Sequence, residues 1–230
     1  MVVRLLSGGA ATGLVARLAE RFAADTGQEI EGDFGAVGGM RDRVVSGEQI
    51  DLVILTRAIV EQLADQGFVE AESVTDIGQV VTGVAVLEGT TAPDVSSPDA
   101  LGAALGNATA LYVPDTLQAT AGIHVAKVVD ALGLKEQLEG RIHEFPNGQT
   151  AMAEMARSGD ARALGSTQIT EILNTPGVVY GGPLPDPHGL STMYTAAVST
   201  AAAQPRDARK LIELLALKEN ASIRESVGFS

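Results

Sequence analysis

Five short segments rich in glycine, alanine and hydroxyl residues stand where a strand is expected to give way to a helix. They are Ser7–Thr12, Gly35–Gly39, Asp115–Gly122, Asn147–Gln149 and Ser166–Gln168. The first turn of a helix presents unpaired backbone N–H groups and a partial positive charge, and small residues let a ligand approach that backbone closely. Such segments, gathered at one site, bind a small anion without basic side chains. The alternative, that each is only a tight turn or a helix cap, stays open for any single segment.

Particular residues in and beside these segments are expected to contact the ligand. We expect the site to be lined by Ser7, Gly8, Ala11, Ala36, Val37, Gly38, Thr56, Arg57, Thr120, Ala121, Gly122, Asn147, Ser166 and Gln168. Arg57 directly follows a strand, where its guanidinium can bind a carboxylate through two parallel hydrogen bonds. The alternative for Arg57 is a solvent-exposed residue at a helix start.

Proton transfer at the same site would fall to His124 or Asp115. His124 lies on the helix that Thr120, Ala121 and Gly122 open, and histidine titrates near neutral pH. The alternative interpretation of His124 is a histidine packed on the flank of a helix. The alternative interpretation of Asp115 is a residue that caps a turn. These roles apply only if the protein is an enzyme.

The composition limits how an anion can be held. The 230 residues carry 16 basic and 29 acidic side chains, a formal net charge of −13. Such a charge opposes contact with nucleic acid or an anionic membrane, because both need basic patches. We therefore expect a small anionic ligand as partner, no nucleic acid and no membrane insertion, with the anion held mainly by the backbone.

Several classes of chemistry lack their residues in this chain. It has no cysteine, which excludes disulfide scaffolds, thiolate metal sites and cysteine nucleophiles. It also lacks a phosphate-binding loop with lysine, a Gly-x-Ser-x-Gly nucleophile turn and a His-Glu-x-x-His metal motif. We expect no metal and no cofactor, and any enzyme on this chain to be a cofactor-independent isomerase or tautomerase.

The first apolar run, Val2–Leu6, is too short for a secretory signal and is typical of a first strand. No apolar run approaches the roughly 20 residues that span a bilayer. As it stands the sequence predicts a cytoplasmic protein. The alternative is a periplasmic protein whose signal peptide has been removed, and an importer permease is an expected partner only in that case.

Alternating strands and helices position the candidate site. In the first part of the chain we expect strands at Val2–Leu6, Glu29–Phe34 and Leu52–Leu55 and helices at Ala10–Thr26, Met40–Val45 and Ala58–Gln66. Leu14, Leu18 and Phe22 recur at helical spacing, and Gly27 is expected to end their helix. This alternation predicts a doubly wound, parallel α/β sheet.

A second alternating series follows the apolar, β-branched strand Gln79–Leu87. Its expected strands are Ala110–Val113, Ile142–Phe145, Ala163–Gly165, Val178–Tyr180 and Thr192–Val198. Its expected helices are Ala121–Leu132, Thr150–Arg157, Gln168–Leu173 and Pro205–Lys218. A further helix should begin at Pro98, with Ser97 as its cap. Two such series predict two lobes, 1–82 with 195–230 and 83–194. The loops after their strands should converge on one central ligand cleft, with hinges near Thr82–Ala85 and Met193–Ala196.

The residues of these loops resemble a known family. Phe34–Val44, followed by Ser46-Gly47-Glu48 and Asp51–Thr56, is similar to the molybdate-binding proteins of ABC importers. Further similarity lies at Ala121-Gly122-Ile123, Ser166–Ile172 and Met193–Val198. The resemblance covers nearly the whole chain and implies a type II periplasmic-binding-protein fold. It also implies that Tyr194 lies near the ligand, against the alternative of a core aromatic.

The chain departs from that family at the second loop. Where molybdate binders offer serine hydroxyls, this sequence has Ala36, Val37 and Gly38. A branched apolar side chain removes water from an oxyanion without replacing its hydrogen bonds. A small organic carboxylate therefore fits this sequence better than molybdate.

Two functions remain open. The first is a two-lobed binding protein that closes on a small anion. The second is an isomerase of a small unsaturated carboxylic acid, since the resembled family includes aconitate isomerases. That reaction needs a proton-transfer group, for which His124, Asp115 and Tyr194 are the candidates, and donors for the developing negative charge.

Overall fold

The computed structural model describes residues 2–230 and divides them into two compact units. The outer unit comprises residues 2–80 and Thr192–Ser230, and the inserted unit comprises Val81–Ser191. The chain therefore leaves the outer unit once, folds the inserted unit, and returns.

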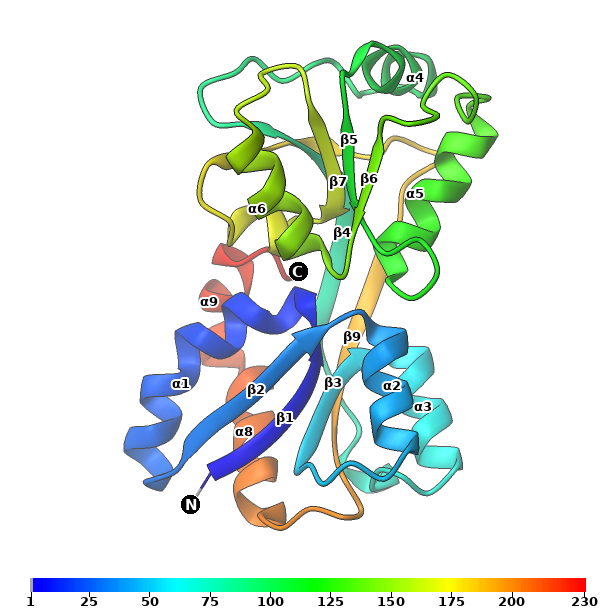
Figure 1. Cartoon of the computed structure of the whole chain (residues 1–230). Helices are drawn as coiled ribbons and strands as arrows, with labels where there is room; N and C mark the ends of the chain where they lie inside the picture. Colours follow the sequence, from blue (N-terminus) through cyan, green and yellow to red (C-terminus); the bar gives the residue numbers. More distant parts are fainter. Residues whose placement is uncertain (1) are drawn as a thin grey trace. The chain divides into compact units, whose positions relative to one another are not determined.

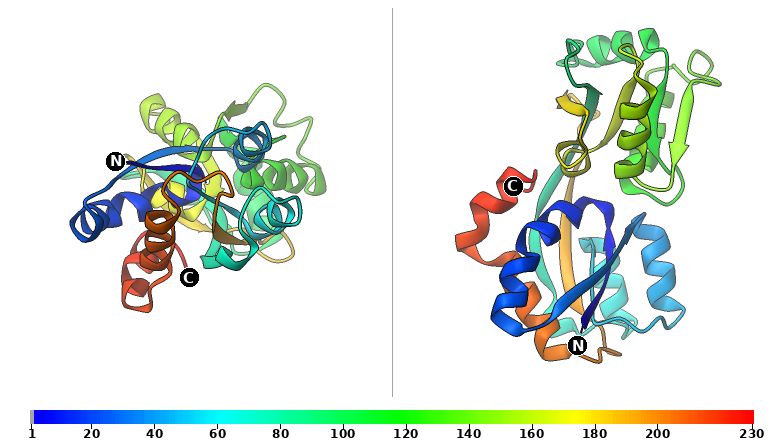
Figure 2. Two further views of the ribbon diagram at one scale, coloured as in Figure 1. Left: turned by 90° about the horizontal axis from the view of Figure 1, so that it is seen from below. Right: turned by 60° about the vertical axis from the view of Figure 1, so that its left-hand side comes forward.

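The outer unit is a mixed sheet with helices on both faces (Figures 1 and 2). Its elements are β1 (Val2–Gly8), η1 (Gly9–Ala11), α1 (Thr12–Thr26), β2 (Glu29–Gly35), α2 (Val37–Val45), β3 (Leu52–Thr56), α3 (Arg57–Asp65), η2 (Ala71–Ser73), the first half of β4 (Thr75–Leu87), most of β9 (Ser191–Val198), α8 (Pro205–Ala216), η3 (Lys218–Asn220) and α9 (Ala221–Ser226). The strand order is β2-β1-β3-β9-β4. β1 runs parallel to β2 and β3, and β9 antiparallel to β3. Helices α1 and α8 cover one face and α2 and α3 the other.

Local sequence explains the first helix of this unit. Leu14, Leu18 and Phe22 of α1 are buried, as their helical spacing predicts. Gly27 ends the helix with φ of 69°, a left-handed conformation that favours glycine, and its N–H donates to the carbonyl of Ala23.

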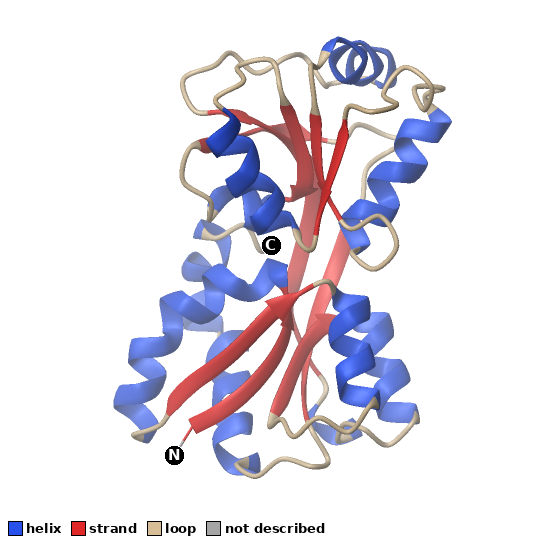
Figure 3. Ribbon diagram, in the orientation of Figure 1, coloured by secondary structure: helices blue, strands red, loops and turns tan. Residues whose placement is uncertain are grey.

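The inserted unit has the same layered construction (Figure 3). Its elements are the second half of β4, α4 (Pro98–Asn107), β5 (Leu111–Pro114), α5 (Thr120–Ala131), β6 (Ile142–Phe145), α6 (Gly148–Ser158), β7 (Leu164–Gln168), α7 (Ile169–Leu173) and β8 (Val178–Pro183). The order is β4-β7-β5-β6, with β8 also paired to β4. β5 is parallel to β6 and β7, whereas β4 is antiparallel to β7 and β8.

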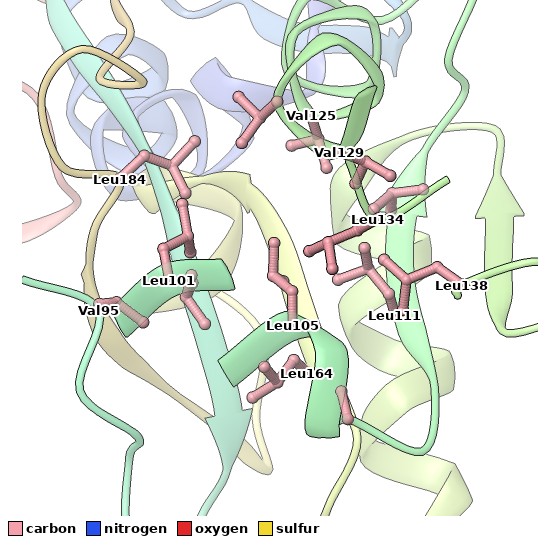
Figure 4. Close-up of a cluster of buried hydrophobic side chains, with 14 of the residues drawn as sticks. Val95, Leu101, Leu105, Leu111, Val125, Val129, Leu134, Leu138, Leu164 and Leu184 are labelled. Carbon is pink, nitrogen blue, oxygen red and sulfur yellow. The ribbon is translucent and has the colours of Figure 1, made fainter. Parts of the chain in front are cut away.

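Each face of this second sheet has its own apolar core. Val84 and Val86 of β4 point to the face where Leu101, Leu105, Val125 and other residues of α4 and α5 pack (Figure 4). The alternate residues of β4 point to the α6 face, where Met152 packs with them. The strand is buried on both faces, which is why it reads as a continuous apolar run.

The sequence predicted most of these elements and missed three features. The helix expected at Met40–Val45 begins three residues earlier, at Val37, because Gly38 and Gly39 lower helix propensity without preventing a first turn. The last helix ends at Ala216, and η3 and α9 follow it. The sheets are mixed rather than wholly parallel, since β4 and β9 pair antiparallel with their neighbours.

Helix α5 approaches the strand before it unusually closely at Gly122. A Cβ atom there would lie 2.2 Å from the carbonyl oxygen of Asp115 and 2.4 Å from that of Pro114. Both contacts are with backbone atoms, which cannot swing aside. Only glycine permits this packing of α5.

We expect Gly122→Ala to lower the free energy of unfolding by about 1–3 kcal/mol or more, because the helix must shift to relieve the overlap. Gly102→Ala on α4 is the matched control: its Cβ would come no closer than 3.9 Å to Leu132, so better helix propensity should stabilise by about 0.5–1 kcal/mol. Urea denaturation measures both. Equal effects of the two substitutions would contradict this packing.

Candidate functional site

In the outer unit, three parallel strands end at one edge of the sheet, and a helix begins at each end. β1 ends at Gly8, β2 at Gly35 and β3 at Thr56, and η1, α2 and α3 follow directly. The residues before these helices, Gly8, Ala36 and Thr56, make no side-chain cap hydrogen bond. The N–H groups of their first turns are therefore not used by cap side chains.

Gly8 is the centre of this edge. A Cβ atom at Gly8 would lie 2.8 Å from Val37 Cγ1 and 3.0 Å from Tyr194 Cε1. Both side chains are buried, and the Tyr194 ring also packs edge-on against Phe229. The structure thus places Val37 and Tyr194 beside Gly8, with the tyrosine ring in the core of its unit.

The hydroxyl groups near Gly8 donate to the backbone. Ser7 Oγ donates to the carbonyl of Gly8 at 2.9 Å and is fully buried. Thr12 Oγ1 donates to the carbonyl of Gly9 at 2.7 Å. Each hydroxyl has a single proton, so neither side chain has a donor left for an anion. Ala10 and Ala11, also buried here, add only backbone.

Arg57 has carboxylate partners within its own unit. Its Nη1 lies 2.9 Å from Asp76 Oδ2 and its Nε lies 3.0 Å from Glu61 Oε1. Asp76 Oδ1 in turn accepts a hydrogen bond from Thr195 at 2.8 Å. Arg57 therefore links α3 to β4 and β9, and its predicted part in binding a ligand stays a prediction.

In the inserted unit, β5, β6 and β7 end at one edge, where α5, α6 and α7 begin. The residues before α5 and α7, Ala119 and Gln168, make no side-chain cap hydrogen bond. Helix α6 differs, because Asn147 Oδ1 accepts from the N–H of Thr150 at 2.8 Å. Asn147, predicted as a ligand contact, acts here as a helix cap.

The Gln168 side chain is buried without any hydrogen bond. Gln168 is 2% exposed, and neither Nε2 nor Oε1 has a partner among the described residues. Thr82, directly opposite on β4 and 1% exposed, has an unpartnered Oγ1 as well. Buried polar groups are nearly always paired, so two side by side mark a place where a polar ligand would be stabilised.

Strand alternation places Gln168 relative to α5. Leu164, Ser166 and Gln168 alternate along β7, so they share the face on which Leu164 packs against α5 residues. Helix α5 begins at the edge where β7 ends, so the Gln168 amide lies on the α5 side of the sheet near that helix start. Ser166 Oγ is already bonded to the carbonyl of Gly83, at 3.0 Å.

A buried carboxylate lies on the opposite face. Glu171 of α7 is 6% exposed, and its Oε1 accepts from the N–H of Gly148 at 3.2 Å. Its Oε2 accepts from Thr167 Oγ1 at 2.5 Å. Burial raises the pKa of this carboxyl, and the hydrogen bonds from Thr167 and the backbone oppose that rise.

The two candidates for proton transfer both have intramolecular partners. His124 Nε2 lies 2.7 Å from the carbonyl oxygen of His188, so α5 is tied to the loop after β8. Asp115 Oδ1 accepts from the N–H groups of Leu117 and Gln118 at 2.7 and 2.8 Å. This is the turn cap that was the alternative for Asp115.

Sequence reasoning missed the buried, unpartnered hydroxyl of Thr82 and the buried carboxyl group of Glu171. Thr82 is a hydroxyl within an otherwise apolar strand, a signal that polar groups meet there. Glu171 lies four residues after Thr167, the spacing of neighbours on a helix surface, but on a helix this short nothing in the sequence shows that it is buried.

Comparison with known proteins identifies the family. A family model described as bacterial extracellular solute-binding protein matches residues 3–230. The chain belongs to this family. An aconitate isomerase from a Pseudomonas species is 27% identical to this solute-binding protein over 232 residues, spanning 97% of the chain and 86% of that relative.

Solved structures share the fold at low identity. The periplasmic molybdate-binding protein of Azotobacter vinelandii superposes with a TM-score of 0.80 at 18% identity, over 99% of this chain and 98% of that one. The sulfate-binding protein of Mycobacterium tuberculosis gives a TM-score of 0.76 at 15% identity, over 100% and 86%. The type II periplasmic-binding-protein fold and the molybdate-binding-like resemblance are confirmed.

Within residues 2–230, His, Asp and Glu side chains form no group of three or more that could hold a metal ion. None of the helices over the same residues combines the length and the apolar character that crossing a membrane requires.

Glu171 makes stability depend on pH in a defined direction. Because folding raises its pKa, its contribution is fully present below the ordinary carboxyl pKa and is lost as pH rises through the raised value. Relative to Glu171→Gln, the wild-type free energy of unfolding should fall as pH rises above the ordinary carboxyl pKa, by at most about 1.4 kcal/mol per pH unit. Thr167→Val, which removes an opposing hydrogen bond, should extend the fall to higher pH. Denaturant titrations at a series of pH values measure the difference in free energy of unfolding between wild type and Glu171→Gln. A difference that stays constant or increases as pH rises is incompatible with a raised pKa.

Gln168→Met should raise the free energy of unfolding by about 1 kcal/mol, because it replaces an unpaired buried amide by an apolar chain of the same length. Ser166→Ala is the control on the same strand: its hydroxyl has a partner, so its loss should cost about 1 kcal/mol. Thermal unfolding compares them. A Gln168→Met variant as destabilised as Ser166→Ala would mean that the amide is paired.

Proposed function

We propose that this solute-binding protein binds a small organic carboxylate in preference to a tetrahedral oxyanion. The observation that carries the proposal is the position of Val37, whose methyl group lies against Gly8 at the start of α2. A serine there would offer a hydroxyl to the ligand, whereas valine offers only its backbone N–H.

The number of donors supports this choice. A tetrahedral oxyanion brings four oxygen atoms to one place, and all must regain hydrogen bonds when they leave water, whereas a single carboxylate group brings two. At the outer unit's edge, the hydroxyls of Ser7 and Thr12 donate to backbone carbonyls, which leaves the N–H groups at helix starts and the hydroxyl of Thr56 as donors. These suffice for one carboxylate group more readily than for four oxygens.

The charges fit the same donors. With a net charge of −13, and with Arg57 engaged by Asp76 and Glu61, the anionic groups of a ligand are left to oriented N–H groups at helix starts. The Gln168 amide supplies an N–H donor and an oxygen acceptor in the inserted unit. We propose that it is a ligand contact of the inserted unit.

The alternative is an isomerase of a small unsaturated carboxylic acid. One observation favours it: the aconitate isomerase similar over 97% of this chain. In that role, helix-start N–H groups would stabilise the negative charge that develops when a proton leaves the carbon beside a carboxylate. His124 is the candidate proton carrier in the inserted unit, and Tyr194 in the outer unit.

The two functions imply different surroundings. A binding protein of an importer works outside the cytoplasm and delivers its ligand to a permease, and we propose that partner for the first function. An isomerase needs no permease and can act in the cytoplasm.

Thermal unfolding with a set of candidate ligands distinguishes binding of carboxylates from binding of oxyanions. We expect trans-aconitate or cis-aconitate to raise the melting temperature, by the equivalent of about 2.7 kcal/mol at a hundred times Kd, and molybdate and sulfate to leave it unchanged. Val37→Ser should bind molybdate about tenfold more tightly than wild type, because it adds a hydrogen bond to a charged group worth about 1.5 kcal/mol. Val45→Ser, at the exposed end of the same helix, is the control.

Strong stabilisation of the wild type by molybdate, with none from the carboxylates, would overturn the proposal. Gln168→Met should abolish the shift with the aconitates while the protein stays folded.

Proton NMR in heavy water tests the isomerase. Conversion of cis-aconitate to trans-aconitate with deuterium in the product supports it, and His124→Gln should then slow turnover. Return of the ligand unchanged, with a saturable thermal shift, assigns the protein to binding alone.

A further inference from the structure

The start of α6 holds a carboxyl group of the protein itself. Gly148 N–H, in the first turn of this helix, donates to Glu171 Oε1, and Thr167 Oγ1 donates to Oε2. A Cβ atom at Gly148 would lie 2.0 Å from Oε2, so the carboxylate occupies the space that any other residue's side chain would need. The group is thus seated against the helix start as a bound anion would be.

We propose that the Glu171 carboxyl group fills the α6 start in the place of a ligand anion and thereby determines which anions this protein accepts. The part that concerns selectivity rests on the proposed function, and the part that concerns occupancy stands on the contacts alone.

Asn147 and Glu171 share the first turn of α6. Asn147 accepts from the N–H of Thr150, and Glu171 accepts from that of Gly148. Burying a carboxylate is costly unless it is paired, and none of the ion pairs found among the described residues includes Glu171. Its partners are hydroxyl and N–H donors only, which are the donors that a ligand's carboxylate would use.

Occupancy of this helix start has a consequence for ligands. The N–H of Gly148 and the hydroxyl of Thr167 already donate to Glu171, and its carboxyl group fills the space in front of them. A ligand must therefore place its anionic groups at helices without such an occupant. Helix α5 begins without a side-chain cap.

Chemical rescue tests occupancy. Glu171→Ala removes the carboxylate and leaves the N–H of Gly148 and the hydroxyl of Thr167 facing the space. Its melting temperature should fall, and formate or acetate should raise it again in a saturable way, relative to chloride at equal ionic strength. Wild type and Glu171→Gln should show no such response, because in both a side chain fills the space.

A folded Glu171→Ala protein that responds to formate and acetate no more than to chloride would overturn the proposal. If the variant does not fold in buffer, refolding is carried out with each anion. Recovery with formate but not with chloride supports the proposal, and recovery with neither overturns it.

Anion affinities test the part of the proposal that concerns selectivity. Glu171→Ala should bind sulfate and molybdate at least about tenfold more tightly than wild type, since it frees the N–H of Gly148 and the hydroxyl of Thr167 to donate to an oxyanion. No gain in oxyanion affinity, despite rescue by formate, would overturn the selectivity part. A wild type that ignores the aconitates would instead count against the proposed function, whatever the rescue shows.

Discussion

Both units depend on close contacts at three glycines, where a side chain on any other residue would stand in the way. At Gly8 the missing Cβ makes room for Val37 and Tyr194, at Gly122 for the backbone carbonyls of β5, and at Gly148 for the Glu171 carboxylate. In each case a helix or its neighbour comes nearer to a strand end than any other residue would permit. The helix starts are thereby fixed in place before any ligand arrives.

This construction suits an acidic protein that must hold an anion. Oriented N–H groups at helix starts act as fixed partial charges and need no reorganisation on binding, unlike the flexible side chains of lysine or arginine. The two units treat their helix starts differently. In the outer unit α2 begins without a cap, whereas in the inserted unit α6 carries both an amide cap and a carboxylate. Specificity then depends on which helix starts stay available.

The sequence predicted the fold well because its signals are local. The spacing of Leu14, Leu18 and Phe22, the glycine at position 27 and the Ser97 cap before Pro98 each specify a short stretch of chain. The antiparallel pairing of β9 with β3 depends on contacts between distant parts of the chain, so alternation of strands and helices could not reveal it.

The site was harder to predict for a related reason. Glycine-rich segments identified the helix starts, but not which donors and acceptors each side chain uses. Ser7, Asn147 and Asp115 had the right residue types and proved to bond to their own backbone. Conversely, Thr82 and Glu171 gain their importance from burial and from partners across the sheet or the helix, which spacing along the chain does not show. The most direct test is a ¹⁵N NMR titration with trans-aconitate that follows the backbone amides of Val37 and Gly38. The account predicts that these signals shift and saturate; saturable binding that leaves them unmoved and shifts the Arg57 guanidinium signal instead would contradict it.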